Sequence, residues 1–152
     1  VGFCILSCTF PQCDFANNWT QYGSNCYRLK VDTRKSWASA RYDCVQDGGD
    51  LVSIASAEEE QFLPDFHQVD IPDIWIGLSD KDQDGVFKWV DKTAITFSNY
   101  APGWPKNTYL VNLCFLPGNY EGKWETTNCF KLLGYICEMT GGQNPKPTSA
   151  PG

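Results

Sequence analysis

The chain has 152 residues, a net charge of -6 and 42% hydrophobic residues, which suffices for one domain with its own buried core. The negative charge disfavours broad electrostatic attraction to phosphate backbones, so we do not expect a nucleic-acid partner. No stretch approaches the roughly 18 uninterrupted apolar residues that a membrane-spanning helix requires. We therefore expect no membrane insertion of this segment.

The eight cysteines are even in number and scattered rather than arranged as CxxC pairs, and His67 is the single histidine. This pattern favours disulfide bonds and an oxidising compartment over zinc, so we expect a secreted protein or an extracellular ectodomain. A single histidine, with the cysteines expected in bridges, provides no obvious nucleophile and base, and we do not expect an enzyme.

A first helix is predicted to begin after Ser36, a good N-cap, and to end at Gly48-Gly49. The apolar residues between them fall on one face at helical spacing: Trp37, Ala40, Cys44 and Val45.

A second helix is predicted after the extended segment LVSI. Ser56 and Glu59 have the spacing of a capping box, in which each side chain satisfies a backbone donor of the other residue. Pro64 cannot continue the helix, so we expect the helix to end or kink near Leu63.

Short apolar and aromatic runs separated by turn residues then predict strands: IWIGL, VFKWV, VNLCFL, GKWE and GYICEM. The segment between Val90 and Leu110 has turn residues but no periodicity. Loops of that length in a compact domain are usually functional, so we expect the binding surface there.

The run DKDQDGVFKWVD, from Asp80 to Asp91, has nearly the spacing of a calcium loop between two helices. Such a loop requires an amphipathic helix on each side, and both flanks here are typical of strands. We therefore interpret the run as an acidic connection between strands.

Eight segments occur in order between about residues 13 and 138: NCYRL, SWASARYDC, GGDLVSI, WIGLSD, FKWVD, FSNYAPGWP, KWETTNC and GYICE. With these segments the chain resembles a C-type lectin-like domain of the long form, which has an N-terminal disulfide hairpin. The resemblance implies an α+β fold, with two helices flanking short, mostly antiparallel sheets, a long loop region and disulfide staples. We expect a domain at 13–139, preceded at 1–12 by an extension or signal-peptide remnant and followed at 140–152 by a flexible Gly/Pro-rich tail or linker.

The resemblance implies three disulfides: Cys44 with Cys137, Cys114 with Cys129, and Cys13 with Cys26. Cys4 and Cys8 remain, and they could pair with each other or link two chains into a homo-oligomer.

In the resembled family a sugar is usually held through a calcium ion whose ligands include a Glu-Pro-Asn or Gln-Pro-Asp triplet. That triplet falls here on Trp104-Pro105-Lys106. An indole and an ammonium cannot coordinate calcium. We therefore expect recognition without the usual sugar-coordinating ion, and no required cofactor.

Structural calcium has two candidate positions by the same resemblance. One would use Asp80 and Asp84 with Asn107 and Asn112, and its alternative is a solvated turn in which Asp side chains cap backbone donors. The other would use Ser53, Glu59 and Glu138, and its alternative is the capping box at Glu59 and an ordinary exposed Glu138.

We predict a non-catalytic recognition module that binds a carbohydrate or glycoprotein through the long-loop face. The candidate ligand residues are Tyr100, Trp104, Lys106, Asn107, Asn112, Glu125 and Thr126. A protein-binding role, as a subunit of a disulfide-linked oligomer or a module of a receptor ectodomain, is the alternative. Ice binding by a surface of Thr and apolar groups is the third.

Overall fold

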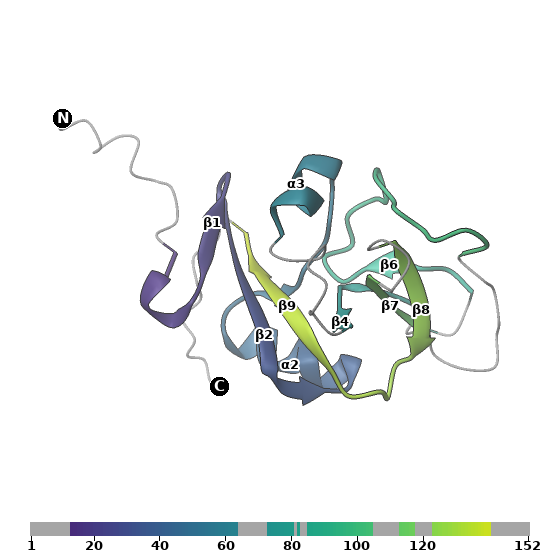
Figure 1. Cartoon of the computed structure of the whole chain (residues 1–152), viewed down its shortest axis with the longest axis horizontal. Helices are drawn as coiled ribbons and strands as arrows, with labels where there is room; N and C mark the ends of the chain where they lie inside the picture. Colours follow the sequence, from purple (N-terminus) through teal and green to yellow (C-terminus); the bar gives the residue numbers. More distant parts are fainter. Residues whose placement is uncertain are drawn as a thin grey trace.

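The computed structural model of the chain describes residues 13–63, 73–80, 82, 85–104, 113–117 and 123–140. These residues form two α-helices and two small sheets, arranged as in Figure 1, in agreement with the predicted α+β class. The helices are α2 (Trp37–Gln46) and α3 (Ala57–Phe62), after a single 3-10 turn, η1 (Phe15–Asn17). The strands are β1 (Thr20–Tyr22), β2 (Asn25–Lys35), β3 (Asp50–Leu51), β4 (Ile74–Trp75), β5 (Leu78–Ser79), β6 (Lys88–Trp89), β7 (Leu113–Pro117), β8 (Trp124–Asn128) and β9 (Leu133–Met139).

The first sheet is built around β9. Its strand order is β1-β2-β9-β3, with β4 added parallel to β9. The second sheet has the order β6-β5-β7-β8, and all its pairs are antiparallel. Each of the five predicted apolar runs contains a strand. The long strand β2 is not an apolar run, because its apolar residues alternate with Arg, Lys and Asp, and the apolar pattern therefore did not predict it.

Helix α2 begins as predicted, because the Ser36 hydroxyl accepts a hydrogen bond from the Ser39 amide at 3.3 Å. Trp37, Ala40 and Cys44 are buried. Val45 is 46% exposed, so its placement on the buried face was wrong. At about 100° per residue Val45 lies beyond the edge of the stripe that the other three residues define.

Helix α3 also begins as predicted, but its capping box is only half formed. The Ser56 hydroxyl accepts from the Glu59 amide at 3.0 Å, whereas the Glu59 carboxylate accepts from Ala55 rather than from Ser56. The helix stops before Leu63, whose ψ of 123° lies outside the helical region. A residue that precedes proline is disfavoured in the helical region, and this explains the predicted end.

Three disulfides staple the two sheets and α2, and they confirm the implied pairings. Cys44–Cys137 joins α2 to β9, Cys114–Cys129 joins β7 to the segment after β8, and Cys13–Cys26 closes the N-terminal hairpin. Cys4 and Cys8 lie outside the described residues, so their pairing stays a prediction. Each bridge restricts the unfolded chain and so stabilises the fold, by about 3 kcal/mol for loops of this size or more.

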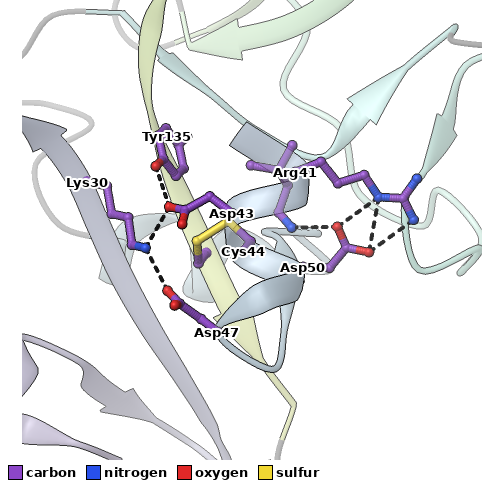
Figure 2. The surroundings of a disulfide bond; sticks show 9 residues. Lys30, Arg41, Asp43, Cys44, Asp47, Asp50 and Tyr135 are labelled. Atoms are coloured by element: carbon purple, nitrogen blue, oxygen red, sulfur yellow. Dashed lines mark hydrogen bonds and ion pairs between the residues drawn. A yellow bond between two sulfur atoms is a disulfide. The ribbon is translucent and has the colours of Figure 1, made fainter. Parts of the chain in front are cut away.

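Polar contacts hold α2 against the first sheet around the Cys44–Cys137 bridge (Figure 2). Lys30 of β2 donates to Asp43 at 2.7 Å and to Asp47 at 2.6 Å, and the Tyr135 hydroxyl also donates to Asp43. Burial raises the pKa of Asp43, but the hydrogen bonds from Lys30 and Tyr135 outweigh that effect and leave the pKa below its ordinary value.

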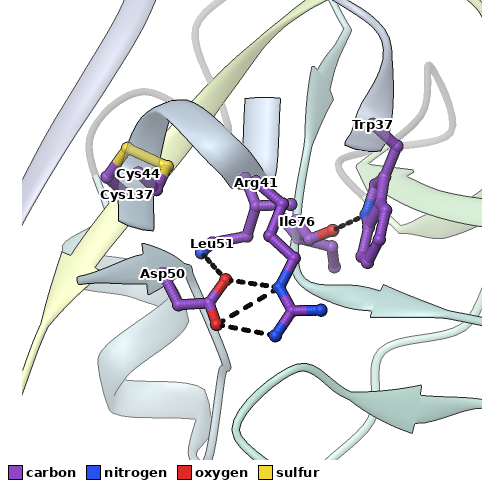
Figure 3. A network of polar contacts seen from close by, with 7 residues as sticks. All are labelled: Trp37, Arg41, Cys44, Asp50, Leu51, Ile76 and Cys137. Carbon is purple, nitrogen blue, oxygen red and sulfur yellow. Dashed lines mark hydrogen bonds and ion pairs between the residues drawn. A yellow bond between two sulfur atoms is a disulfide. The ribbon is translucent and has the colours of Figure 1, made fainter. Parts of the chain in front are cut away.

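A second set of contacts ties α2 to β3 and to the region around β4 (Figure 3). Arg41 binds both carboxylate oxygens of Asp50, and the Trp37 indole N–H donates to the Ile76 carbonyl at 2.9 Å. A buried indole that donates in this way satisfies its polar end while its ring packs in the core.

The turn after α2 passes so close to β9 that it requires glycine at Gly49. A Cβ added there would lie 2.1 Å from the Glu138 carbonyl oxygen. Gly49→Ala should therefore destabilise the fold by about 2 to 3 kcal/mol through overpacking, measured by chemical denaturation. Gly23→Ala is the control, because its Cβ meets nothing within 4 Å and only the positive φ of +61° adds strain, at about 1 kcal/mol. Equal losses for the two variants would contradict this reading.

Candidate functional site

The acidic run from Asp80 to Asp91 connects two strands, as predicted. Strand β5 comes directly before the run and β6 lies within its second half, and the two strands pair in the register Leu78↔Trp89 and Ser79↔Lys88. Asp80 is 1% exposed, and its carboxylate accepts from the Gly85 amide at 3.2 Å. Gly85 has a φ of +79°, which suits a tight turn. Asp80 thus caps a backbone donor of the turn, but it is buried, so the expectation that it is solvated was wrong.

Of the first candidate calcium position, the structure describes only Asp80. The other three members, Asp84, Asn107 and Asn112, lie outside the described residues. Among the described residues no group of three or more His, Cys, Asp and Glu side chains is arranged to hold a metal ion.

The second candidate position is a buried cluster where β2, α3 and β9 meet. The Glu138 carboxylate accepts from the Ser53 amide at 3.0 Å and from the Asn25 side chain at 3.1 Å. The Tyr27 hydroxyl donates to Glu59. Glu138 is 7% exposed, so the alternative of an ordinary exposed Glu138 was wrong. Glu138 lies on β9, which is an interior strand of the first sheet, between β2 and β3.

The electrostatics of this cluster disfavour negative charge. Burial, together with the nearby charges of Glu59 and Asp91, raises the pKa of Glu138 to about 8, against the opposing hydrogen bond from Ser53. Burial also raises the pKa of Tyr27. A cavity of about 190 Å³ is lined by residues that include Ser53, Asp91 and Glu138. The Ser53 hydroxyl is buried and has no hydrogen-bond partner among the described residues.

The long-loop face is anchored on Trp124 of β8, which is completely buried. The Trp124 amide donates to the Asn99 carbonyl at 2.7 Å, and the Ala101 amide donates to the Trp124 carbonyl at 2.9 Å. The rings of Trp89, Phe97 and Tyr100 meet the Trp124 ring edge-on, with centroids 5.6 to 5.8 Å away. The loop segment around Tyr100 is thereby fixed beside β8.

Four of the predicted ligand residues belong to the described part of the chain. Tyr100 and Trp104 are half-buried in the loop, and Glu125 and Thr126 are half-buried on β8 directly after Trp124. Burial raises the pKa of Tyr100, so its hydroxyl is protonated and can donate. The remaining predicted residues, Lys106, Asn107 and Asn112, lie outside the described residues.

Sequence reasoning missed Glu60, which is 6% exposed on α3. Its carboxylate accepts from the Trp124 indole N–H at 2.6 Å and from the Asn99 side-chain amide at 2.9 Å. The available signal was indirect: a core tryptophan needs an acceptor for its N–H, and carboxylates near the predicted helix could supply one.

Comparison with known proteins identifies the family. Residues 33–139 match the family model described as the Lectin C-type domain. The human C-type mannose receptor 2 is 32% identical over 125 residues, which is 82% of this chain and 8% of the receptor. The chain thus spans less than a tenth of that relative's length.

Solved structures support the same assignment. The cow C-type carbohydrate-recognition domain of CD23, in the presence of GlcNAc2Man3 oligosaccharide, is 35% identical with a TM-score of 0.70, over 80% of this chain and 92% of that one. A calcium-independent type II antifreeze protein is 26% identical with a TM-score of 0.72, over 81% of this chain and 92% of that one.

None of the helices described here has the length and hydropathy needed to span a bilayer. The matched family consists of non-enzymatic lectins and receptors, in agreement with the prediction that the chain is not an enzyme. With a model match over 33–139 and three of the family's disulfides in place, the chain belongs to the C-type lectin domain family.

Proposed function

We propose that the chain is a recognition module, with its domain at 13–139, that binds a carbohydrate or glycoprotein through the long-loop face without the usual sugar-coordinating calcium. The observation that carries the proposal is a loop segment bonded to β8 on both sides of Tyr100, which sets the half-buried Tyr100 against Trp124, the residue before Glu125, with the half-buried Trp104 farther along the same segment. An aromatic ring can pack on the apolar face of a sugar, while adjacent oxygens accept from its hydroxyls.

The coordination chemistry of the loop supports recognition without the ion. By the family resemblance, we infer that Trp104-Pro105-Lys106 falls where the family usually has Glu-Pro-Asn or Gln-Pro-Asp. Calcium requires six to eight oxygen ligands, and two of the oxygen donors of that triplet are replaced here by groups that cannot supply one. The mannose receptor and the oligosaccharide-containing CD23 structure favour a carbohydrate as the ligand class.

A glycan array run with calcium and with a chelator tests this proposal. Binding should survive the chelator, and Trp104→Ala should weaken it by about fivefold or more, because stacking on an aromatic ring contributes on the order of 1 kcal/mol or more. Phe130→Ala is the matched control, since Phe130 is an aromatic residue with 73% exposure outside this loop. Binding that the chelator abolishes, or that Phe130→Ala weakens as much as Trp104→Ala, would contradict the proposal.

We also propose that the cluster of Ser53, Glu59 and Glu138 can hold a structural cation, although ligand binding does not require it. The donor set fits a hard cation: two buried carboxylates, and a buried hydroxyl without a partner among the described residues. A bound cation would offset the cost of burying the charge of Glu138, and it would link the entrance of α3 to β9.

The cluster makes a specific prediction about pH. The pKa of Glu138 rises from 4.5 to about 8 on folding, so the folded state binds the proton more tightly than the unfolded state. In chelator, the contribution of Glu138 to the free energy of unfolding should therefore be greatest below pH 4.5 and fall as the pH rises toward 8. Urea denaturation across this range should show a loss of a few kcal/mol that Glu138→Gln removes.

Calcium should raise the melting midpoint more at pH 8 than at pH 5, because the ion competes with the proton for Glu138. Glu58→Gln, an exposed position on the same helix as Glu59, should leave both behaviours unchanged. An unchanged midpoint with calcium at pH 8 would refute the cation site. If the free energy of unfolding of Glu138→Gln fell with pH as steeply as that of the wild type, the pH effect would not belong to Glu138.

Two alternatives stay as proposals. Protein recognition in an extracellular receptor or a disulfide-linked homo-oligomer is supported by the receptor relative and by the three bridges. Ice binding is supported by the similarity to an antifreeze protein. Non-reducing electrophoresis and thermal-hysteresis measurements separate these alternatives from glycan recognition.

A further inference from the structure

We propose that Glu60 is the positioning residue of the long-loop face: its buried carboxylate fixes the loop segment Asn99–Trp104 against β8 without touching the ligand. This inference rests on the proposed function, because it names the device that holds the proposed binding surface in place. Glu60 belongs to α3, outside the loop and outside β8.

The carboxylate joins three separate elements of the fold. One oxygen accepts from the Trp124 indole of β8 at 2.6 Å, and the other accepts from the Asn99 side-chain amide of the loop at 2.9 Å. Both partners are donors, so the site requires an acceptor at both atoms. A carboxylate meets that requirement, whereas a carboxamide would turn an N–H₂ group toward one of the donors.

The orientation of Asn99 is fixed from its other side as well. The Lys123 ammonium donates to the Asn99 side-chain oxygen at 2.9 Å, which leaves the side-chain nitrogen to face Glu60. The chain of contacts therefore runs from a buried anion through an amide to a cation. Such pairing lowers the cost of burying the Glu60 charge.

The same residues control the backbone around Tyr100. The Asn99 carbonyl accepts from the Trp124 amide, the Trp124 carbonyl accepts from the Ala101 amide, and the Ala101 carbonyl accepts from the Trp104 amide at 3.0 Å. Glu60 accepts from the side chains of Asn99 and Trp124, whose backbone groups form the first of these hydrogen bonds. Loss of these two contacts would remove one of the hydrogen bonds that orient the Asn99 side chain and leave the Trp124 N–H buried without that acceptor, a cost that opening of the loop would relieve.

The test compares Glu60→Gln with the double variant Glu60→Gln/Asn99→Asp. In the single variant the carboxamide introduced on α3 turns its N–H₂ group toward the Asn99 side chain or the Trp124 indole, both of which are donors. Hydrogen exchange at the backbone amides of Ala101 and Trp104 should therefore speed up by about tenfold or more. In the double variant the carboxylate introduced on the loop can accept both from the carboxamide introduced on α3 and from Lys123, so exchange should return toward the wild-type rate. The amide of Val52, bonded to Ile136 in the first sheet, should keep its wild-type rate throughout.

Glu58→Gln is the matched control, because Glu58 is exposed on the same helix, and it should leave exchange unchanged. Wild-type exchange in Glu60→Gln, or a double variant that exchanges as fast as the single variant, would overturn the inference. Should Glu60→Gln fail to fold, Asn99→Ala removes only the loop side of the network. Faster loop exchange in that variant supports the inference, and unchanged exchange overturns it.

Ligand binding separates this inference from the proposed function. Glycan affinity should fall about tenfold in Glu60→Gln and recover in the double variant. Hydrogen exchange is measured without ligand, so a faster loop in Glu60→Gln supports the positioning role even if none of the variants binds a glycan. The absence of glycan binding would refute the proposed function but not the positioning role of Glu60.

Discussion

The complete burial of Trp124 is the constraint on which the rest of the long-loop face depends. Its ring has zero exposure and meets three other aromatic rings edge-on, an arrangement that favours close packing and a defined orientation. A buried indole must also place its N–H on an acceptor, and a buried strand must satisfy its backbone groups. Glu60 meets the first requirement, and the loop backbone at Asn99 and Ala101 meets the second. A segment without regular periodicity thus acquires a fixed shape.

Buried carboxylates recur as the acceptors that join elements of this fold. Glu60 joins α3 to β8 and the loop, Glu138 joins β9 to Ser53 and Asn25, and Asp80 caps its own turn. In each case at least one N–H donor offsets part of the desolvation cost. The pKa of Glu138 shows that the compensation there is incomplete. This incomplete compensation makes the Glu138 cluster, rather than the capped turn at Asp80, the better candidate for a structural cation.

The sequence predicted the features that depend on local chemistry or on strong motifs. Caps at Ser36 and Ser56, the end of α3 before Pro64 and the strands around the acidic run all follow from short-range rules, and they appear in the structure. The three disulfides followed from the family resemblance. Features that depend on tertiary contacts were beyond sequence reasoning. The burial of Glu60 and Glu138 depends on partners 64 and 85 residues away, at Trp124 and Ser53. The exposure of Val45 depends on where the edge of the covered face falls, and none of these features leaves a periodic signal in the chain.

The proposed function depends on the coordination chemistry of the loop, and a crystal structure tests that chemistry most directly. Crystals grown in millimolar calcium and soaked with the best-bound monosaccharide would show the contacts of the sugar. We predict a sugar packed against Trp104 or Tyr100 with no ion between it and the protein. A sugar coordinated to a calcium ion beside Pro105 would contradict recognition without the ion.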